Sequence, residues 1–151
     1  MTKRSKIENR MTEYPATATP KMSVTSAIDL MRNHKIRHLP VVAKGKVVGV
    51  VSDRDLRQAE LLSDSMQLLV SDVMTPRPYC VKVGTPLEEV ASVMAKRKLG
   101  CAIVLSRKNR VVGIFTTTDG MKVLSEVLKS SPRALSSGRS VEQLLEDAYL
   151  I

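Results

Sequence analysis

The sequence contains an internal repeat, and this repeat constrains the fold more than any other feature of the chain. Met11 recurs as Met74, 63 positions later, and the same offset relates the apolar positions that follow. From Gly49, which recurs as Gly113, the offset is 64, so the second copy has one extra residue. That residue falls after Val42, in a predicted hairpin turn, where an insertion is tolerated best. The chain is therefore predicted to hold two copies of one structural unit.

A predicted strand–helix junction stands at the same place in each copy. The two stretches are Gly49-Val50-Val51-Ser52-Asp53-Arg54-Asp55 and Gly113-Ile114-Phe115-Thr116-Thr117-Thr118-Asp119. The apolar residues predict the end of a buried strand, and the hydroxyl residue predicts the N-cap of a helix. Free N–H groups and the positive dipole end of such a helix attract anions. The following aspartate can accept hydrogen bonds from a sugar, so the junction is a candidate nucleotide site.

The same pattern has a purely structural interpretation. A hydroxyl residue followed three positions later by an acid resembles a capping box, which only satisfies backbone donors at the helix start. One copy alone does not distinguish the two interpretations. The recurrence of the pattern inside a longer repeat favours nucleotide binding.

Apolar periodicity predicts the order strand, helix, strand, strand, helix in each copy. In the first copy these elements are residues 16–18, 23–34, 39–42, 47–51 and 52–62. In the second they are residues 79–83, 86–97, 101–105, 111–115 and 117–128. Leu56, Ala59 and Leu62 are expected to face the core. Neither copy is expected to bury enough apolar surface alone, so the pair should share a core.

The ends of the chain differ from the repeats in composition. Residues 1–10 are basic and predict a frayed or partly helical arm. Residues 129–139 predict a linker, and a capping-box start at Ser140 predicts a short helix to about Tyr149. That helix is expected to pack on the body of the protein or across a dimer interface. The predicted organisation is thus an arm (1–10), a first repeat (11–65), a second repeat (66–128), and a linker with the C-terminal helix (129–151).

Composition narrows the functional classes. The net charge of +9 favours phosphorylated ligands, nucleic acid or an acidic protein partner, without choosing among them. With no Trp, one Phe and three Tyr, the chain has few residues for stacking on single-stranded nucleic acid. The basic run Lys96-Arg97-Lys98 is interpreted as a solvated helix end rather than a nucleic-acid patch.

No catalytic or metal-binding constellation emerges from the residue types. Two cysteines and two histidines give neither a disulfide framework nor a metal quartet, and no Walker-type glycine loop is present. Cys80 and Cys101 are interpreted as small packed hydrophobes, with a redox-sensitive pocket as the alternative. No stretch has the character of a signal peptide or membrane span. The chain is expected to be a soluble, cytoplasmic protein without enzymatic activity and without a membrane partner.

The recurring residues resemble those of a known family. Met-Thr-x-x-Pro at Met11, the stretch Ile36-Arg37-His38-Leu39-Pro40-Val41-Val42, and the junction through Leu56 closely resemble a CBS domain. The second copy resembles another, so residues 11–128 resemble a tandem CBS pair, or Bateman module. The resemblance implies an α+β (α/β) fold of two pseudo-symmetric β-α-β-β-α repeats packed on each other. It also implies two clefts for adenosyl ligands such as AMP, ADP, ATP or S-adenosylmethionine, and association into homodimers.

The resemblance further implies the residues of each cleft. For the first cleft they are Thr17, Ile36, Arg37, His38, Leu39, Pro40, Ser52, Arg54 and Asp55. Ser52 and Asp55 match the family's ribose- and phosphate-binding hydroxyl and acid, and Thr17 and Ile36 border the adenine. For the second cleft they are Cys80, Leu99, Gly100, Cys101, Ala102, Thr116, Thr118 and Asp119. Basic residues of the first set are replaced there, so weaker or more neutral binding is expected.

The leading hypothesis is a regulatory module that senses an adenine nucleotide or related adenosyl ligand and signals to a partner protein by conformational change. The alternative is a homodimeric scaffold with vestigial clefts that binds an acidic protein or, less favoured, nucleic acid. The regulated partner is not identifiable from the sequence.

Overall fold

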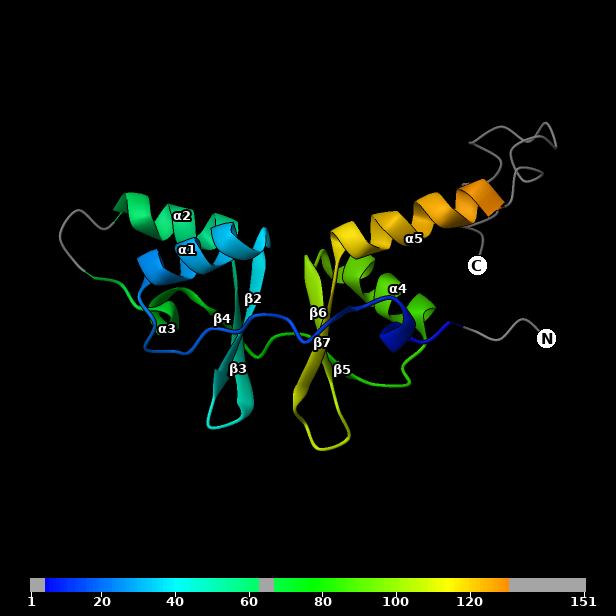
Figure 1. The fold of residues 1–151 in the computed structure, drawn as a ribbon, viewed down its shortest axis with the longest axis horizontal. Helices are drawn as coiled ribbons and strands as arrows, with labels where there is room; N and C mark the ends of the chain where they lie inside the picture. The colour runs from blue at the N-terminus through cyan, green and yellow to red at the C-terminus, as the bar shows by residue number, and fades with distance from the viewer. Residues whose placement is uncertain (1–4, 63–66, 131–151) are drawn as a thin grey trace. The chain divides into compact units, whose positions relative to one another are not determined.

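The computed structural model describes residues 5–62 and 67–130, so the C-terminal helix predicted at 140–149 lies outside the described residues. The described residues up to Asp119 belong to one compact unit, and residues 120–130 belong to a second one. Most strands and helices follow the order that the sequence predicts (Figure 1). Two short strands and two short helices are added, and the first predicted strand of the first repeat is missing. The fold is α+β and holds two repeats of strands and helices.

Two sheets carry the strands. One sheet has the order β2 (His38–Ala43), β3 (Lys46–Ser52), β4 (Thr75–Pro76). The other has the order β1 (Thr12–Glu13), β7 (Val111–Thr116), β6 (Cys101–Leu105), β5 (Cys80–Lys82). The β5–β6 pair is parallel, and the other strand pairs are antiparallel.

The length difference between the copies falls in the hairpin turn, as the sequence predicts. The β2–β3 hairpin pairs Ala43 with Lys46, which leaves a two-residue turn in which Lys44 and Gly45 both have positive φ. That is the backbone twist a two-residue hairpin prefers. The β6–β7 hairpin has a longer turn, closed by a hydrogen bond of 2.8 Å from the Ser106 N–H to the Arg110 carbonyl.

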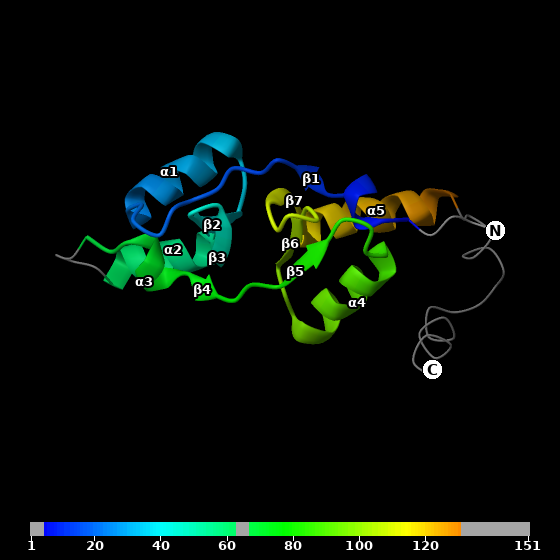
Figure 2. The same cartoon turned by 90° about the horizontal axis from the view of Figure 1, so that it is seen from below.

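The two repeats exchange their first strands, which the sequence does not predict. β1 belongs to the first repeat and pairs with β7 of the second, whereas β4 follows the first repeat and pairs with β3 (Figure 2). Two-residue strands show no period, so propensity cannot find them. The Met and Gly residues that recur in the two copies contact each other across this exchange. A Cβ at Gly49 would lie 2.6 Å from the Met74 Sδ, and Gly113 is covered by Met11 in the same way. Each methionine therefore packs on the glycine of the other repeat.

The helices of the first repeat enclose its core. α1 (Val24–His34) begins where the Ser23 hydroxyl accepts a hydrogen bond of 3.0 Å from the Ser26 N–H. α1 packs against α2 (Asp53–Leu62), as Figure 1 shows. Both helices contribute apolar side chains to the core. The prediction for Leu62 is wrong, because its side chain is 85% exposed. The predicted strand at 16–18 is reduced to a single bridge between Ala18 and Val41.

The second repeat is built on α4 (Leu87–Arg97) and the start of α5 (Thr117–Ser130). α3 (Val70–Val73), a single turn that the sequence did not predict, precedes β4. Over residues 5–10 the basic arm is partly helical, which is one of the two predicted alternatives, but it is docked rather than frayed. There a 3-10 helix, η1 (Ile7–Asn9), carries the fully buried Ile7, whose N–H bonds the Thr85 carbonyl at 2.9 Å. One apolar side chain in a basic segment gives no periodic signal, so this docking is missed.

Candidate functional site

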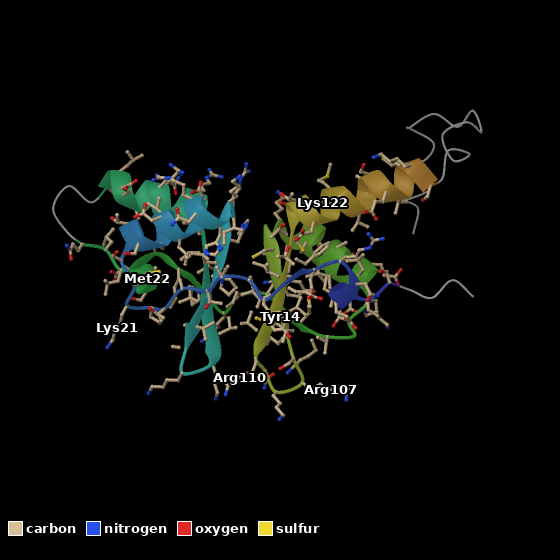
Figure 3. The ribbon with its side chains drawn as sticks, in the orientation of Figure 1. Tyr14, Lys21, Met22, Arg107, Arg110 and Lys122 are labelled. Carbon is tan, nitrogen blue, oxygen red and sulfur yellow. The ribbon has the colours of Figure 1, made fainter. Side chains whose placement is uncertain are left out.

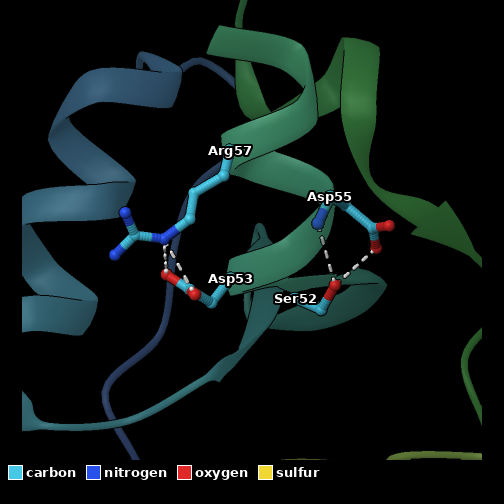
Figure 4. Close-up of polar contacts among 4 residues, drawn as sticks. All are labelled: Ser52, Asp53, Asp55 and Arg57. Carbon is cyan, nitrogen blue, oxygen red and sulfur yellow. Dashed lines mark hydrogen bonds and ion pairs between the residues drawn. The ribbon is translucent and has the colours of Figure 1, made fainter. Parts of the chain in front are cut away.

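The first strand–helix junction places Ser52 at the end of β3 and Asp55 in the first turn of α2. The Ser52 hydroxyl accepts from the Asp55 N–H at 3.1 Å and donates to the Asp55 Oδ2 at 2.7 Å (Figure 4). Asp53 faces a different partner, since both of its carboxylate oxygens accept from the Arg57 Nε at 2.9–3.0 Å. Among the described residues, the hydrogen bond to the Asp55 carboxylate uses one oxygen, so its second oxygen can accept from a ligand.

The second junction is a complete capping box. The Thr116 hydroxyl accepts from the Asp119 N–H at 3.3 Å, and the Asp119 Oδ2 accepts from the Thr116 N–H at 2.9 Å. The other carboxylate oxygen of Asp119 accepts from the Thr12 hydroxyl at 3.5 Å. Both oxygens of Asp119 therefore accept hydrogen bonds within the protein, although the bond from Thr12 is long. The structural interpretation of the motif explains this copy better than it explains the first.

A cleft of about 430 Å³ opens beside the first junction and is lined by residues of both repeats. The first repeat contributes His38, Val50, Ser52, Arg54 and Asp55. The second repeat contributes Leu99, Gly100 and Cys101 from the start of β6. Further lining comes from Thr75, Arg77, Pro78 and Tyr79 around β4, and from Arg97 and Lys98 at the end of α4.

Seven of the residues predicted from the sequence are thus brought together in one cleft. Four belong to the predicted first set (His38, Ser52, Arg54, Asp55), and three belong to the second (Leu99, Gly100, Cys101). The prediction had placed these two groups in separate clefts.

The other predicted residues do not line this cleft. Leu39, Pro40 and Ala102 are fully buried, whereas Thr17, Arg37 and Thr118 are exposed elsewhere. Ile36, Cys80, Thr116 and Asp119 are half-buried outside it. Their ligand roles stay predictions.

Sequence reasoning missed the cations that the second repeat brings to the cleft. Arg97 and Lys98 belong to the run interpreted as a solvated helix end, and Arg77 was not considered. The Arg97 guanidinium lies over the Tyr79 ring, 5.6 Å from its centre, within the range of a cation–π contact. The signal that could have found them is the basic run Lys96-Arg97-Lys98. The helix that carries this run ends just before the predicted site residues at the start of β6, so its last side chains are expected near that site.

The ionisation of the cleft leaves it cationic at neutral pH. Burial lowers the pKa of His38, with Asp55 opposing the shift and Arg37 adding to it, so the imidazole is mostly neutral. Gly100 makes room for this ring, because a Cβ there would lie 2.6 Å from the His38 Nε2. The permanent charges that line the cleft are those of Arg54, Arg77, Arg97 and Lys98, against the single carboxylate of Asp55.

The cysteine thiols are protonated under the same conditions. Burial raises the pKa of Cys101 to about 11, and the nearby Cys80 adds to the shift. Burial also raises the pKa of the Cys80 thiol. Because the thiolate is the reactive form, these shifts favour cysteine as a packed hydrophobe over a redox-sensitive pocket.

The described residues, 5–62 and 67–130, show neither a metal site nor a membrane-spanning helix. Over these residues the structure shows no group of three or more His, Cys, Asp or Glu side chains arranged to hold a metal ion. None of the helices in the same part of the chain combines the length and apolar character needed to cross a membrane.

Two segments of the chain, residues 5–62 and 70–126, each match the family model of the CBS domain. A CBS domain-containing protein of Dictyostelium discoideum is 31% identical over 118 residues, which is 70% of this chain and 81% of that protein. Inosine-5'-monophosphate dehydrogenase of Korarchaeum cryptofilum is 37% identical over 103 residues, or 68% of this chain. The match covers 21% of that enzyme, so the chain spans about a fifth of its length.

Solved structures give the same result. The Vibrio cholerae protein AcuB superposes with a TM-score of 0.75 at 31% identity, over 87% of this chain and 98% of AcuB. CBSX2 of Arabidopsis thaliana, solved in complex with AMP, has a TM-score of 0.69 at 28% identity, over 81% and 97% of the two chains. The CBS domain pair of MJ0100, solved with 5'-methylthioadenosine and S-adenosylmethionine, has a TM-score of 0.75 at 26% identity, over 82% and 98%.

Proposed function

This chain belongs to the CBS-domain family as a tandem pair of domains, and from that premise we propose that it is a regulatory module that binds an adenosyl ligand in the cleft beside Ser52 and Asp55. The observation that carries the proposal is the composition of this cleft. It combines a hydroxyl and carboxylate pair, suited to ribose hydroxyls, with guanidinium and ammonium groups suited to phosphate. The solved complexes of CBSX2 with AMP and of MJ0100 with adenosyl ligands support the same chemical class.

Binding would be coupled to signalling through the surfaces that line the cleft. Because both repeats contribute residues, a ligand that bridges them stabilises one arrangement of their side chains over others. A partner protein that prefers that arrangement then binds with altered affinity. The proposal includes association into a homodimer and a cytoplasmic location. It assigns no catalytic step to this chain.

The test is a thermal-denaturation titration with AMP, ADP, ATP and S-adenosylmethionine on the parent, Asp55→Asn and Asp53→Asn. A ligand at 100 times its Kd stabilises the fold by about 2.7 kcal/mol, which raises the midpoint of a chain of this size by roughly 5–10 °C. Asp53→Asn is the matched control, because it also removes one first-turn carboxylate of α2 but does not line the cleft. We expect the shift to be lost in Asp55→Asn and kept in Asp53→Asn.

Two results would contradict the proposal. One is the absence of any ligand-induced shift in the parent at millimolar concentration. The other is an equal shift in the parent and Asp55→Asn, which would place the ligand elsewhere.

A second candidate function rests on a basic surface at the two hairpin turns. Lys44 and Lys46 lie at the β2–β3 turn, and Arg107 and Arg110 lie at the β6–β7 turn (Figure 3). The Arg110 Nη1 donates to the Gly45 carbonyl at 3.1 Å, which holds the two turns together. No acidic residue occurs in either hairpin. This surface favours the scaffold hypothesis, in which the chain binds an acidic protein segment.

The scaffold hypothesis has its own experiment. Binding of a labelled poly-glutamate peptide should weaken steeply between 50 and 300 mM salt and should be lost in Lys44→Glu/Arg107→Glu. Binding that is unaffected by this double substitution would remove the hairpin surface from consideration.

A further inference from the structure

We infer that the cleft beside Ser52 and Asp55 selects a nucleoside polyphosphate over the corresponding monophosphate and over an adenosyl sulfonium. This inference rests on the proposed function and names the ligand class of the same site. Its basis is the number and origin of the cations that meet there, most of which lie outside the strand–helix junction.

The cations come from three separate elements. Arg54 is in the first turn of α2, Arg77 follows β4, and Arg97 with Lys98 ends α4. The first element belongs to the first repeat and the other two to the second. Groups of the same charge repel one another when the chain brings them together, and a bound anion removes that repulsion. Four cations that line one cleft offer more positive charge than a single phosphate neutralises, which favours an anion with several phosphates.

The cations are also uncompensated by the protein itself. Over the described residues, the ion pairs that the structure shows are Arg32 with Asp29 and Arg57 with Asp53, neither of which lines the cleft. The one carboxylate in the cleft, Asp55, is held by the Ser52 hydroxyl at the junction. A ribose at Asp55 would leave the guanidinium groups of Arg77 and Arg97 for phosphates beyond the first.

Helix-end electrostatics explain only part of this arrangement. Cations at the C-terminus of α4 are stabilised by the helix dipole, which suffices to account for Arg97 and Lys98 at that position. It does not account for Arg77, which follows β4 and lines the cleft with a positive φ of 51°. It does not account for Arg54 at the opposite, positive end of α2.

The same charges disfavour a sulfonium ligand. S-Adenosylmethionine carries a positive sulfur next to the ribose, where a nucleotide carries its first phosphate. In a cleft with four permanent cations and one carboxylate, that charge is repelled. The volume of about 430 Å³ lies within the usual range for small-molecule sites, so size does not exclude a triphosphate.

The experiment is isothermal titration of the full chain with ATP, ADP, AMP, S-adenosylmethionine and inorganic tripolyphosphate, in EDTA so that the phosphates keep their charge. We expect ATP to bind at least tenfold more tightly than AMP, with S-adenosylmethionine weakest. Arg77→Gln and Arg97→Gln should each reduce the ATP/AMP ratio at least threefold while changing the AMP affinity less. Arg32→Gln is the matched control, since it removes an arginine whose side chain is 67% exposed outside the cleft and should leave the ratio unchanged.

The outcomes separate this inference from the proposed function. Equal affinity for ATP and AMP, with Asp55→Asn still abolishing both, overturns the polyphosphate inference and leaves the adenosyl module standing. Tripolyphosphate that binds as tightly as ATP, with no binding of AMP, supports the inference and contradicts the adenosyl proposal. Absence of binding by all five compounds overturns both. Circular dichroism of each variant checks that a reduced ATP/AMP affinity ratio is not caused by unfolding.

Discussion

Replacement of Ile7 by alanine tests whether the N-terminal arm is part of the fold. The Ile7 side chain is fully buried, although it lies in a basic segment, and its N–H bonds the Thr85 carbonyl. Truncating a buried isoleucine to alanine costs about 2–5 kcal/mol, because apolar contacts are lost and a cavity remains. At roughly 2–4 °C per kcal/mol for a chain of this length, the thermal midpoint should fall by about 4–20 °C. Urea denaturation gives the free energy directly, and a cooperative transition with an unchanged slope is expected.

Leu62→Ala is the matched control for Ile7→Ala. Leu62 lies on the periodic apolar stripe of α2, yet its side chain is 85% exposed, so truncation should change the free energy of unfolding by at most about 0.5 kcal/mol. Sequence periodicity alone predicts the opposite order, with Leu62 more costly than Ile7. If Ile7→Ala is within 0.5 kcal/mol of the parent, or if Leu62→Ala costs as much, the docking of the arm is wrong.

Three further predictions concern the exchanged strands and the titrating groups. Gly49→Ala should lower the free energy of unfolding, measured by urea denaturation, by about 1–3 kcal/mol, because the added methyl group overpacks against Met74. The cost should be smaller in a Met74→Ala background, and strictly additive effects of the two substitutions would contradict the strand exchange. Because burial lowers the pKa of His38 below its ordinary value of 6.5, the stability this residue contributes is present above pH 6.5 and is lost as the pH falls below it. The midpoint between pH 5 and 7 should therefore depend less on pH in His38→Gln than in the parent or in the exposed-site control His34→Gln, and equal profiles would refute the assignment. Since burial raises the pKa of Cys101 to about 11, mass spectrometry should find its alkylation by iodoacetamide at pH 8 at least tenfold slower in the folded protein than in urea, whereas equal rates would contradict this.

Elements with a long apolar run or a clear period were predictable from the sequence. The confirmed examples include α1 with its Ser23 cap, the β2–β3 hairpin, and the placement of the extra residue in the β6–β7 turn. The family and the doubled repeat were also predictable, because the same residues recur at a fixed spacing. These features are local, so propensity and pattern determine them.

The features that could not be predicted depend on contacts between distant parts of the chain. β1 and β4 are two residues long and exist because the other repeat offers a strand edge. Arg77 and Arg97 reach the cleft because β4 and the end of α4 lie beside the junction of the other repeat. A local sequence window contains neither partner, so the cationic character of the cleft was assigned only to the first repeat's own residues.

The two junctions show how one motif can serve structure in one copy and remain available for binding in the other. Both hydroxyls cap their helices, so the capping interpretation holds for Ser52 and for Thr116. Capping and ligand binding compete for the acceptor positions of the carboxylate, and fewer of these positions remain for a ligand at Asp119 than at Asp55. Asp119 uses one oxygen within its box and the other on Thr12, whereas the described contact of Asp55 uses one oxygen and the residue lines the cleft. Loss of the carboxylate should therefore affect stability more at Asp119 and ligand binding more at Asp55.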